Sequence, residues 1–178
     1  MSIDHPHIAA VVYDPGEHIE TLLEEAARAL RSQCVRVGGL VQRSVRDNPE
    51  GRCRIELESV GSGTVYPLTQ ALGSQSQSCA LDPAKLADAS MVIREAISAA
   101  ADLVLVNKFG AQEAAGGGLR DEMLEIAVAG IPLLTSVPRR FLDEWHAFMG
   151  DGATLLPMSL DAIVCWWKGI RQSSAIPH

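Results

Sequence analysis

The sequence predicts an α/β domain built on a three-layer, mainly parallel sheet with an appended antiparallel β-hairpin. Two observations carry this prediction. Short apolar runs alternate with amphipathic segments of helical spacing along the chain, which is the pattern of strand–helix–strand units. Apolar residues make up 47% of the 178 residues and aromatic residues only 4%, so aliphatic side chains must fill the core, as they do beneath helices on a parallel sheet. Because neither repeats nor a low-complexity linker interrupt the pattern, residues 1–178 are expected to form one domain.

The chain begins with a predicted strand and helix. Residues 8–13 form an apolar run that ends in Asp14-Pro15-Gly16, which indicates a buried strand followed by a turn. Apolar residues then recur at helical spacing, which predicts an amphipathic helix over residues 18–33.

The next segments predict the hairpin. A second strand is expected over residues 35–45, and Gly38 and Gly39 within it indicate a bulge or a close approach of two backbones. Residues 46–51 read as a turn, and residues 53–58 alternate between apolar and charged types. The two strands should therefore pair in antiparallel fashion.

The second half of the chain returns to alternating strands and helices. Asp82 and Pro83 mark a helix start, because Asp is a favoured N-cap and Pro fits the first helical turn. Gly130 and Gly150 follow later helices as C-terminal stops. The expected strands cover residues 103–106, 131–137 and 153–156, and the expected helices have buried residues within 86–97, 119–127, 141–149 and 160–167.

Composition excludes several classes of partner. The formal net charge is -7 and the Lys and Arg residues form no cluster, so neither a nucleic acid nor a membrane surface is an expected partner. No apolar run reaches the ~18 residues of a membrane helix. The start lacks a signal-peptide pattern and the four cysteines form no CxxC pair, which favours reduced thiols and a cytoplasmic location. The histidines have no zinc-site spacing.

Ligands of parallel α/β sheets bind at the carboxyl ends of the strands, near a switch in strand order. In this chain that rule indicates four segments, which are residues 14–18, 42–46, 107–120 and 136–140.

The first of these segments is placed like a phosphate-binding P-loop. Such a loop needs glycines whose amides wrap the phosphates, a lysine that neutralises them and a hydroxyl that holds magnesium. Ile19 and Glu20 stand where the lysine and the hydroxyl residue belong, so standard triphosphate hydrolysis is not expected. The segment is either an ordinary turn or an altered anion or nucleotide site at a helix N-terminus. Its candidate binding residues are Asp14, Gly16 and His18.

Residues 107–120 form the second candidate loop. Lys108 at a strand end and Arg120 near the next helix are cations suited to an oxyanion. Asn107 stands where a Walker-B carboxylate would lie, and as a neutral group it weakens any magnesium site. The alternative is a flexible loop with surface charges. The candidate binding residues are Asn107, Lys108, Gly110, Glu113 and Arg120, with Glu113 or Asp14 as the base or metal ligand of an enzyme.

Two further segments supply neutral donors and one cation. Residues 61–78 are rich in Gly, Ser, Thr and Gln and read as loops with one short strand near Val65. Ser76 and Ser78 could hold an oxyanion through their hydroxyls, and Arg43 and Ser44 could join them from the second strand. The alternative is a solvated loop, with Arg43 and Ser44 as surface residues without a role.

The strand, altered loop, helix and Val35–Gln42 together resemble the opening of the THEP1-like nucleoside-triphosphatases, which have the P-loop fold. The chain resembles more closely an uncharacterised bacterial family often encoded beside molybdate ABC-transporter genes. The segments that carry this resemblance are Ala10–Asp14, Val37–Gln42, Cys79–Asp82, Val106–Gly110 with Glu113, Gly118–Arg120 and Gly130–Thr135. It implies a P-loop-NTPase-like fold and a role in molybdenum or tungsten handling.

Three functions are compatible with these features. The first is a protein that binds a small anion at the carboxyl edge of the sheet, either molybdate or tungstate or a nucleotide. The second is a divergent nucleoside-triphosphatase, and the third is a protein-interaction module without a ligand. The charged hairpin strand at residues 52–58 offers an edge for pairing with a second copy.

Overall fold

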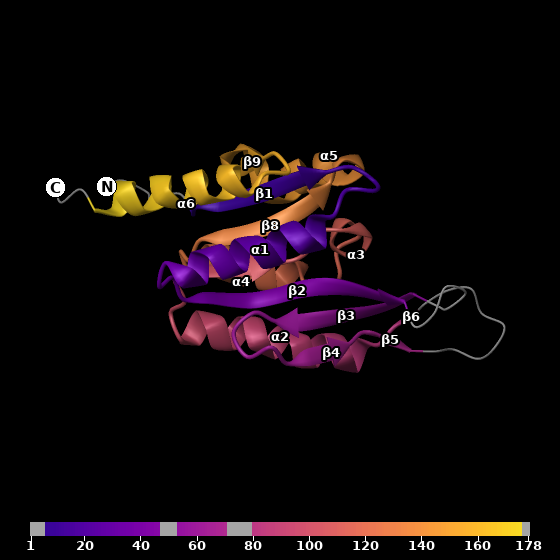
Figure 1. Ribbon diagram of the computed structural model, residues 1–178. Helices are drawn as coiled ribbons and strands as arrows, with labels where there is room; N and C mark the ends of the chain where they lie inside the picture. The colour runs from indigo at the N-terminus through magenta and orange to yellow at the C-terminus, as the bar shows by residue number, and fades with distance from the viewer. Residues whose placement is uncertain (1–5, 47–52, 71–79, 176–178) are drawn as a thin grey trace.

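The computed structural model describes residues 6–46, 53–70 and 80–175. A seven-stranded sheet with the order β4-β3-β2-β7-β8-β1-β9 forms its centre, and β5 and β6 pair separately (Figure 1). The strands are β1 (Ile8–Tyr13), β2 (Val37–Arg46), β3 (Cys53–Ser59), β4 (Val65–Pro67), β5 (Thr69–Gln70), β6 (Ala80–Leu81), β7 (Leu103–Val106), β8 (Leu133–Pro138) and β9 (Thr154–Leu156). The helices are α1 (Ile19–Ser32), α2 (Pro83–Ser98), α3 (Ala111–Ala114), α4 (Arg120–Val128), α5 (Leu142–Met149) and α6 (Leu160–Ser174), with 3-10 turns at Arg139–Phe141 and Gly150–Gly152.

The sheet is mainly parallel, with an antiparallel extension at one end, as the sequence predicted. Strands β2, β7, β8, β1 and β9 pair in parallel. Strand β3 runs antiparallel to β2, and β4 runs antiparallel to β3. The expected edge along the hairpin is covered from Glu56 to Glu58, because β4 pairs with β3 there.

Helices cover both faces of the sheet and separate the core into two clusters. Helices α1 and α6 pack on one face through residues such as Leu23, Ala26 and Trp167. Helices α2, α4 and α5 pack on the other face through Ile93, Met123 and Trp145. Burial of both faces explains why the parallel strands are almost uniformly apolar.

The chain leaves neighbouring strands toward opposite faces at the centre of the sheet. Strand β1 lies between β8 and β9. It continues into α1 on one face, whereas β8 continues through the 3-10 turn into α5 on the other face. A crevice therefore opens between the carboxyl ends of β1 and β8, at the kind of switch point where α/β sheets bind ligands.

Side-chain caps set two helix starts. The Asp82 carboxylate accepts a hydrogen bond from Ala84 N at 2.9 Å, with Pro83 in the first turn, which confirms the predicted start of α2. The Ser159 hydroxyl accepts from Ala162 N at 3.3 Å and begins α6. The short helix α3 and the β5–β6 pair were not predicted.

Close backbone approach explains the adjacent glycines of β2. Gly39 has a φ of 107°, and a Cβ built there would collide with the Leu105 carbonyl of the neighbouring strand. A Cβ at Gly38 would lie 2.6 Å from the Ala96 Cβ of α2. The two glycines therefore allow β2 to fit between β7 and the helix that covers it.

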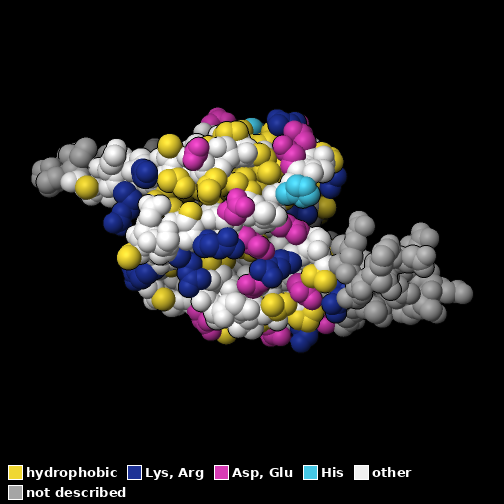
Figure 2. All heavy atoms as spheres, in the orientation of Figure 1, with side chains coloured by type: hydrophobic (Ala, Val, Ile, Leu, Met, Phe, Trp, Pro, Cys, Tyr) yellow, Lys and Arg dark blue, Asp and Glu magenta, His cyan; other side chains and the backbone are white. Residues whose placement is uncertain are grey.

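The face that carries α1 and β2 has charges of both signs (Figure 2). Across the face that carries α1 and β2, Lys and Arg side chains alternate with Asp and Glu (Figure 2). Within the described ranges, no helix combines the length and the apolar character needed to cross a membrane.

Replacing Gly39 by Ala should destabilise the domain strongly. The added methyl group meets the Leu105 carbonyl and the backbone is in a left-handed conformation, so the free energy of unfolding should fall by about 3 kcal/mol. Urea denaturation measures this change. Gly61→Ala is the control, because nothing lies within 4 Å of a Cβ built there. Equal unfolding midpoints for the two variants would contradict the close approach.

Candidate functional site

The crevice at the switch point is lined mainly by charged and aromatic side chains. We call it the switch cleft, and it has a volume of about 530 Å³. Its lining residues come from the ends of β1, β7 and β8 and are Tyr13, Asp14, Pro15, Lys108, Pro138, Arg139 and Arg140. Three cations thus face one carboxylate, which favours an anionic ligand.

One of these cations is already paired. The Arg139 guanidinium donates to both carboxylate oxygens of Asp14, at 2.9 and 3.1 Å, so the pair joins β1 to β8 across the crevice. The hydrogen bonds from Arg139 hold the pKa of the Asp14 carboxyl below its usual range, although its own partial desolvation opposes them. The same bonds raise the pKa of Arg139.

The first loop supplies its own anion. The Glu17 carboxylate accepts a hydrogen bond from Asp14 N at 2.7 Å, and the Glu17 amide donates to the Asp14 carbonyl at 3.2 Å. In a working P-loop the backbone amides at this place bind phosphate. Here a side chain of the loop satisfies one such amide, and the side chain of Ile19 is buried.

Two other cations of the switch cleft are uncommitted. Lys108 and Arg140 form no ion pair with any residue that the structure describes. The Arg140 guanidinium lies 4.9 Å from the centroid of the Phe141 ring. Burial raises the pKa of the Tyr13 hydroxyl, and the nearby charge of Arg140 opposes that shift. These are the side chains free to meet an incoming anion.

A second cavity adjoins the cleft and shares Lys108, Pro138 and Arg140 with it. We call it the loop pocket, and it has a volume of about 270 Å³. It lies between the hairpin and the 107–119 segment. Its other lining residues are Gln42, Ile55, Leu57, Leu68, Leu86, Asn107, Gly110, Ala111, Gln112, Glu113, Gly118, Leu119 and Phe141.

Glu113 holds the wall of this pocket together. Its carboxylate is buried and accepts hydrogen bonds from Gly110 N and from Leu119 N, both at 3.0 Å. A Cβ at Gly118 would collide with the Glu113 carboxylate, which explains the glycine there. The residue considered as a catalytic base or metal ligand therefore has both oxygens engaged in shaping the loop.

Beneath Lys108 lies a buried polar group. Asn107 is 1% exposed, and its carbonyl oxygen accepts a hydrogen bond from Ser136 Oγ at 2.5 Å. Its side-chain nitrogen has no hydrogen-bond partner among the described residues. A buried unpaired donor costs about 1–3 kcal/mol, so such a group is more common at functional sites than in ordinary cores.

Several predicted site residues lie elsewhere. The Arg120 guanidinium stacks over Phe148 at 4.6 Å and donates to the Glu113 carbonyl at 3.5 Å. The Ser44 amide and hydroxyl donate to Glu20 at 3.0 and 2.9 Å. Gly16 and His18 are exposed in the first loop. Ser76 and Ser78 lie outside the described residues.

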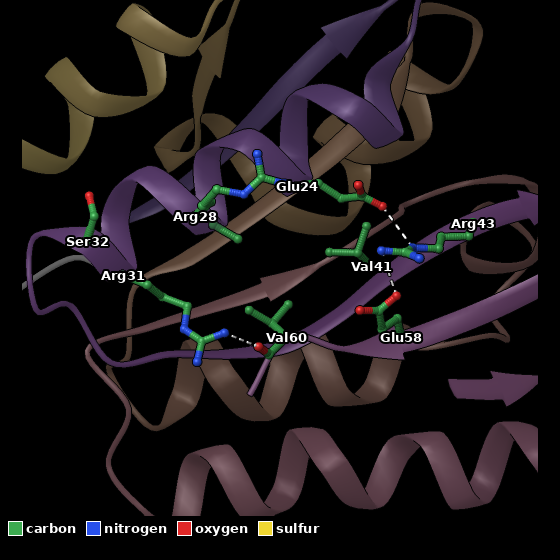
Figure 3. Close-up of a pocket in the computed structure, with 9 residues that line it drawn as sticks. Glu24, Arg28, Arg31, Ser32, Val41, Arg43, Glu58 and Val60 are labelled. Carbon is green, nitrogen blue, oxygen red and sulfur yellow. Dashed lines mark hydrogen bonds and ion pairs between the residues drawn. The ribbon is translucent and has the colours of Figure 1, made fainter. Parts of the chain in front are cut away.

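Arg43 belongs to a different cavity, a groove of about 590 Å³ beneath α1. Its guanidinium forms ion pairs with Glu24 at 2.8 Å and with Glu58 at 2.7 Å (Figure 3). Arg31 on the same groove donates to the Val60 carbonyl at 2.7 Å. This groove is larger than the switch cleft, but carboxylates inside it already neutralise Arg43.

The structure adds two cations to the predicted site, Arg139 and Arg140. Both fall in the 136–140 segment that the strand-end rule indicated, but nothing in their local sequence distinguished them from surface arginines. The pairing of Arg139 with Asp14 depends on strand order, which the sequence pattern does not give, whereas Arg140 contacts Phe141, its neighbour in sequence. No group of three His, Cys, Asp or Glu side chains among the described residues is arranged to hold a metal ion.

Sequence comparison identifies the family of the chain. The family model described as "Protein of unknown function (DUF2478)" matches residues 8–166. A "Molybdenum import ATP-binding protein ModC 2" of Bradyrhizobium diazoefficiens is 39% identical over 168 residues, which are 93% of this chain. The chain spans only 18% of the length of that relative.

Solved structures share the fold. A human cancer-related nucleoside triphosphatase superposes with a TM-score of 0.65 at 18% identity, covering 95% of this chain and 97% of that one. THEP1 from the hyperthermophile Aquifex aeolicus superposes with a TM-score of 0.64 at 14% identity, covering 95% of this chain and 100% of that one. The predicted P-loop-NTPase-like fold is thus confirmed.

Glu113→Ala should destabilise the loop pocket and the domain with it. Two buried backbone amides lose their acceptor, so the free energy of unfolding should fall by about 3 kcal/mol. Denaturation in urea tests this, with the exposed Glu144→Ala expected within about 0.5 kcal/mol of the original protein. A change as small as that of the control would mean that the hydrogen bonds of Glu113 do not stabilise the loop.

The Asp14–Arg139 pair should make stability depend on acid pH. Because the folded pKa of Asp14 lies below its unfolded value, the stabilisation is fully present above the usual carboxyl range. It is lost as the pH falls through the lower, folded pKa. The difference in unfolding free energy between the original protein and Asp14→Asn should therefore be larger at pH 7 than at about pH 2.5.

The matched control for this pH dependence is a double-mutant cycle. In an Arg139→Gln background, Asp14→Asn should have little effect at either pH, because the partner is gone. Urea titrations at both pH values give the free energy of unfolding of all four proteins in the cycle. A pH-independent effect of Asp14→Asn in the original background would contradict the interaction.

Proposed function

The chain belongs to the family described as "Protein of unknown function (DUF2478)", and from that premise we propose that it binds an anionic ligand in the switch cleft. Lys108 and Arg140 are the proposed ligand-binding cations. The observation that carries this proposal is their position. Both line the crevice at the carboxyl ends of β1 and β8, and neither forms an ion pair among the described residues. Charge-assisted hydrogen bonds to such cations are among the stronger polar contacts in proteins.

The proposed ligand is an oxyanion, either molybdate or tungstate or the phosphate of a nucleotide. The link to molybdenum is supported by the relative named as a molybdenum import ATP-binding protein, of which this chain matches a part. The nucleotide alternative is supported by the fold shared with nucleoside triphosphatases. We place the anion at Lys108 and not in the first loop, because the Glu17 carboxylate already accepts the hydrogen bond of a loop amide there.

A second candidate function is that of an interaction module. The same relative contains a domain similar to this chain within a much longer protein. We propose as the alternative that the domain works by contact with an ATP-binding protein of molybdenum import. This candidate requires no ligand in the switch cleft.

Thermal unfolding in the presence of candidate anions tests the proposal. A ligand at about 100 times its Kd stabilises the native state by about 2.7 kcal/mol, which should raise the Tm by roughly 5–10 °C. Molybdate, tungstate, phosphate, ADP and ATP are the probes. Sodium chloride of matched ionic strength corrects for general salt effects.

Variants locate the bound anion. Lys108→Ala should remove most of the rise in Tm, whereas Lys168→Ala on α6 should retain it, because Lys168 is exposed away from the carboxyl edge. If none of the anions raises the Tm at millimolar concentration, the binding proposal is wrong. A stable complex with the ATP-binding protein in that case would support the interaction module instead.

A further inference from the structure

The loop pocket differs in chemistry from the switch cleft that it adjoins. It has aliphatic side chains in its walls that the switch cleft lacks, Ile55 and Leu57 from β3 and Leu86 from α2, together with Phe141 from the 3-10 turn. A bare tetrahedral oxyanion makes no use of apolar walls, since it is held by cations and hydrogen-bond donors alone. The pocket is therefore suited to a different part of a ligand than the cleft is.

We infer that the loop pocket holds the uncharged, flat part of a ligand whose anionic group binds Lys108 and Arg140. The ligand class is then an organic phosphate that carries a heterocyclic ring, such as a purine nucleoside monophosphate. This inference rests on the proposed function, because the anion at Lys108 and Arg140 fixes where the remainder of the ligand lies. Molybdate and tungstate have no ring, so they would leave the loop pocket empty.

The two cavities are connected through the residues that they share. Lys108, Pro138 and Arg140 line both of them, so an anion at these cations lies at the mouth of the loop pocket. A Cβ built at Gly110 would lie 3.2 Å from Lys108 Cε, which shows that the lysine side chain runs along this glycine. The Arg140 guanidinium lies 4.9 Å from the centroid of Phe141, so a cation and an aromatic ring meet at the passage.

Neutral amides give the pocket a means of recognising a ring edge. Gln42 reaches it from β2 and Gln112 from α3. An amide side chain both donates and accepts hydrogen bonds, which matches the mixed edge of a nucleobase. Asn107 adds a buried side-chain nitrogen without a partner among the described residues. Apolar walls with a few polar groups are typical of small-molecule pockets.

The first loop takes no part in the loop pocket. Tyr13, Asp14 and Pro15 line the switch cleft but do not line the loop pocket. The ring would consequently lie over the hairpin and α3. This placement makes Gln42, Ala111 and Gln112 the residues that set specificity.

Isothermal titration calorimetry tests the inference by measuring the affinities for AMP, GMP, ribose 5-phosphate and inorganic phosphate. The ring should increase affinity about tenfold or more, so a nucleotide should bind more tightly than ribose 5-phosphate. Ala111→Trp should abolish this difference, because Ala111 lines the pocket and an indole would fill it. Its affinity for ribose 5-phosphate and inorganic phosphate should stay unchanged. Ala115→Trp, an exposed position outside the lining, is the matched control and should bind like the original protein.

The outcomes separate this inference from the proposed function. If phosphate or molybdate binds in a manner dependent on Lys108, but nucleotides bind no more tightly than ribose 5-phosphate, the inference is wrong and the proposed function stands. If no anion binds at all, both are wrong. An equal loss of nucleotide affinity in Ala111→Trp and Ala115→Trp would also overturn the inference, because the effect would then not come from the pocket.

Discussion

A parallel sheet must be covered on both faces, and the position of the candidate site in this protein follows from that constraint. Helices α1 and α6 cover one face and α2, α4 and α5 the other. The chain leaves the neighbouring strands β1 and β8 toward opposite faces, into α1 and α5. The crevice between them, and the cations that line it, are consequences of how the core is buried.

A P-loop combines a helix N-terminus and a cation in one loop, whereas here the two features lie in two different loops. The first loop keeps the helix N-terminus but lacks the lysine, and Glu17 satisfies an amide that would otherwise be available to an anion. Free positive charge lies instead at the ends of β7 and β8, with Lys108 and Arg140. The 107–119 segment can present that charge because Glu113 fixes its backbone at two points. The fold is thus retained, while the free positive charge lies at the ends of other strands.

Sequence patterns predicted most of the fold because periodicity and capping are local. The parallel strands, the hairpin and the start of α2 follow from short stretches of residues. Helix α3 has four residues and is held by the buried Glu113, so no periodic signal reveals it. The roles of Arg43 and Arg139 depend on partners far along the chain, and only the tertiary structure shows that Glu58 and Asp14 are those partners.

The carboxylate of Asp14 also sets what kind of ion the crevice can admit. An entering anion finds Arg139 already paired with the Asp14 carboxylate. Because that carboxylate belongs to the same domain, its effective concentration at Arg139 is fixed. Occupation of that arginine is an exchange of one anion for another. A singly charged ion such as chloride gains little from the exchange, whereas a group with several oxygens can also reach Lys108 and Arg140. Under the proposed function, an anion with several oxygens therefore binds in this crevice in preference to a singly charged ion such as chloride.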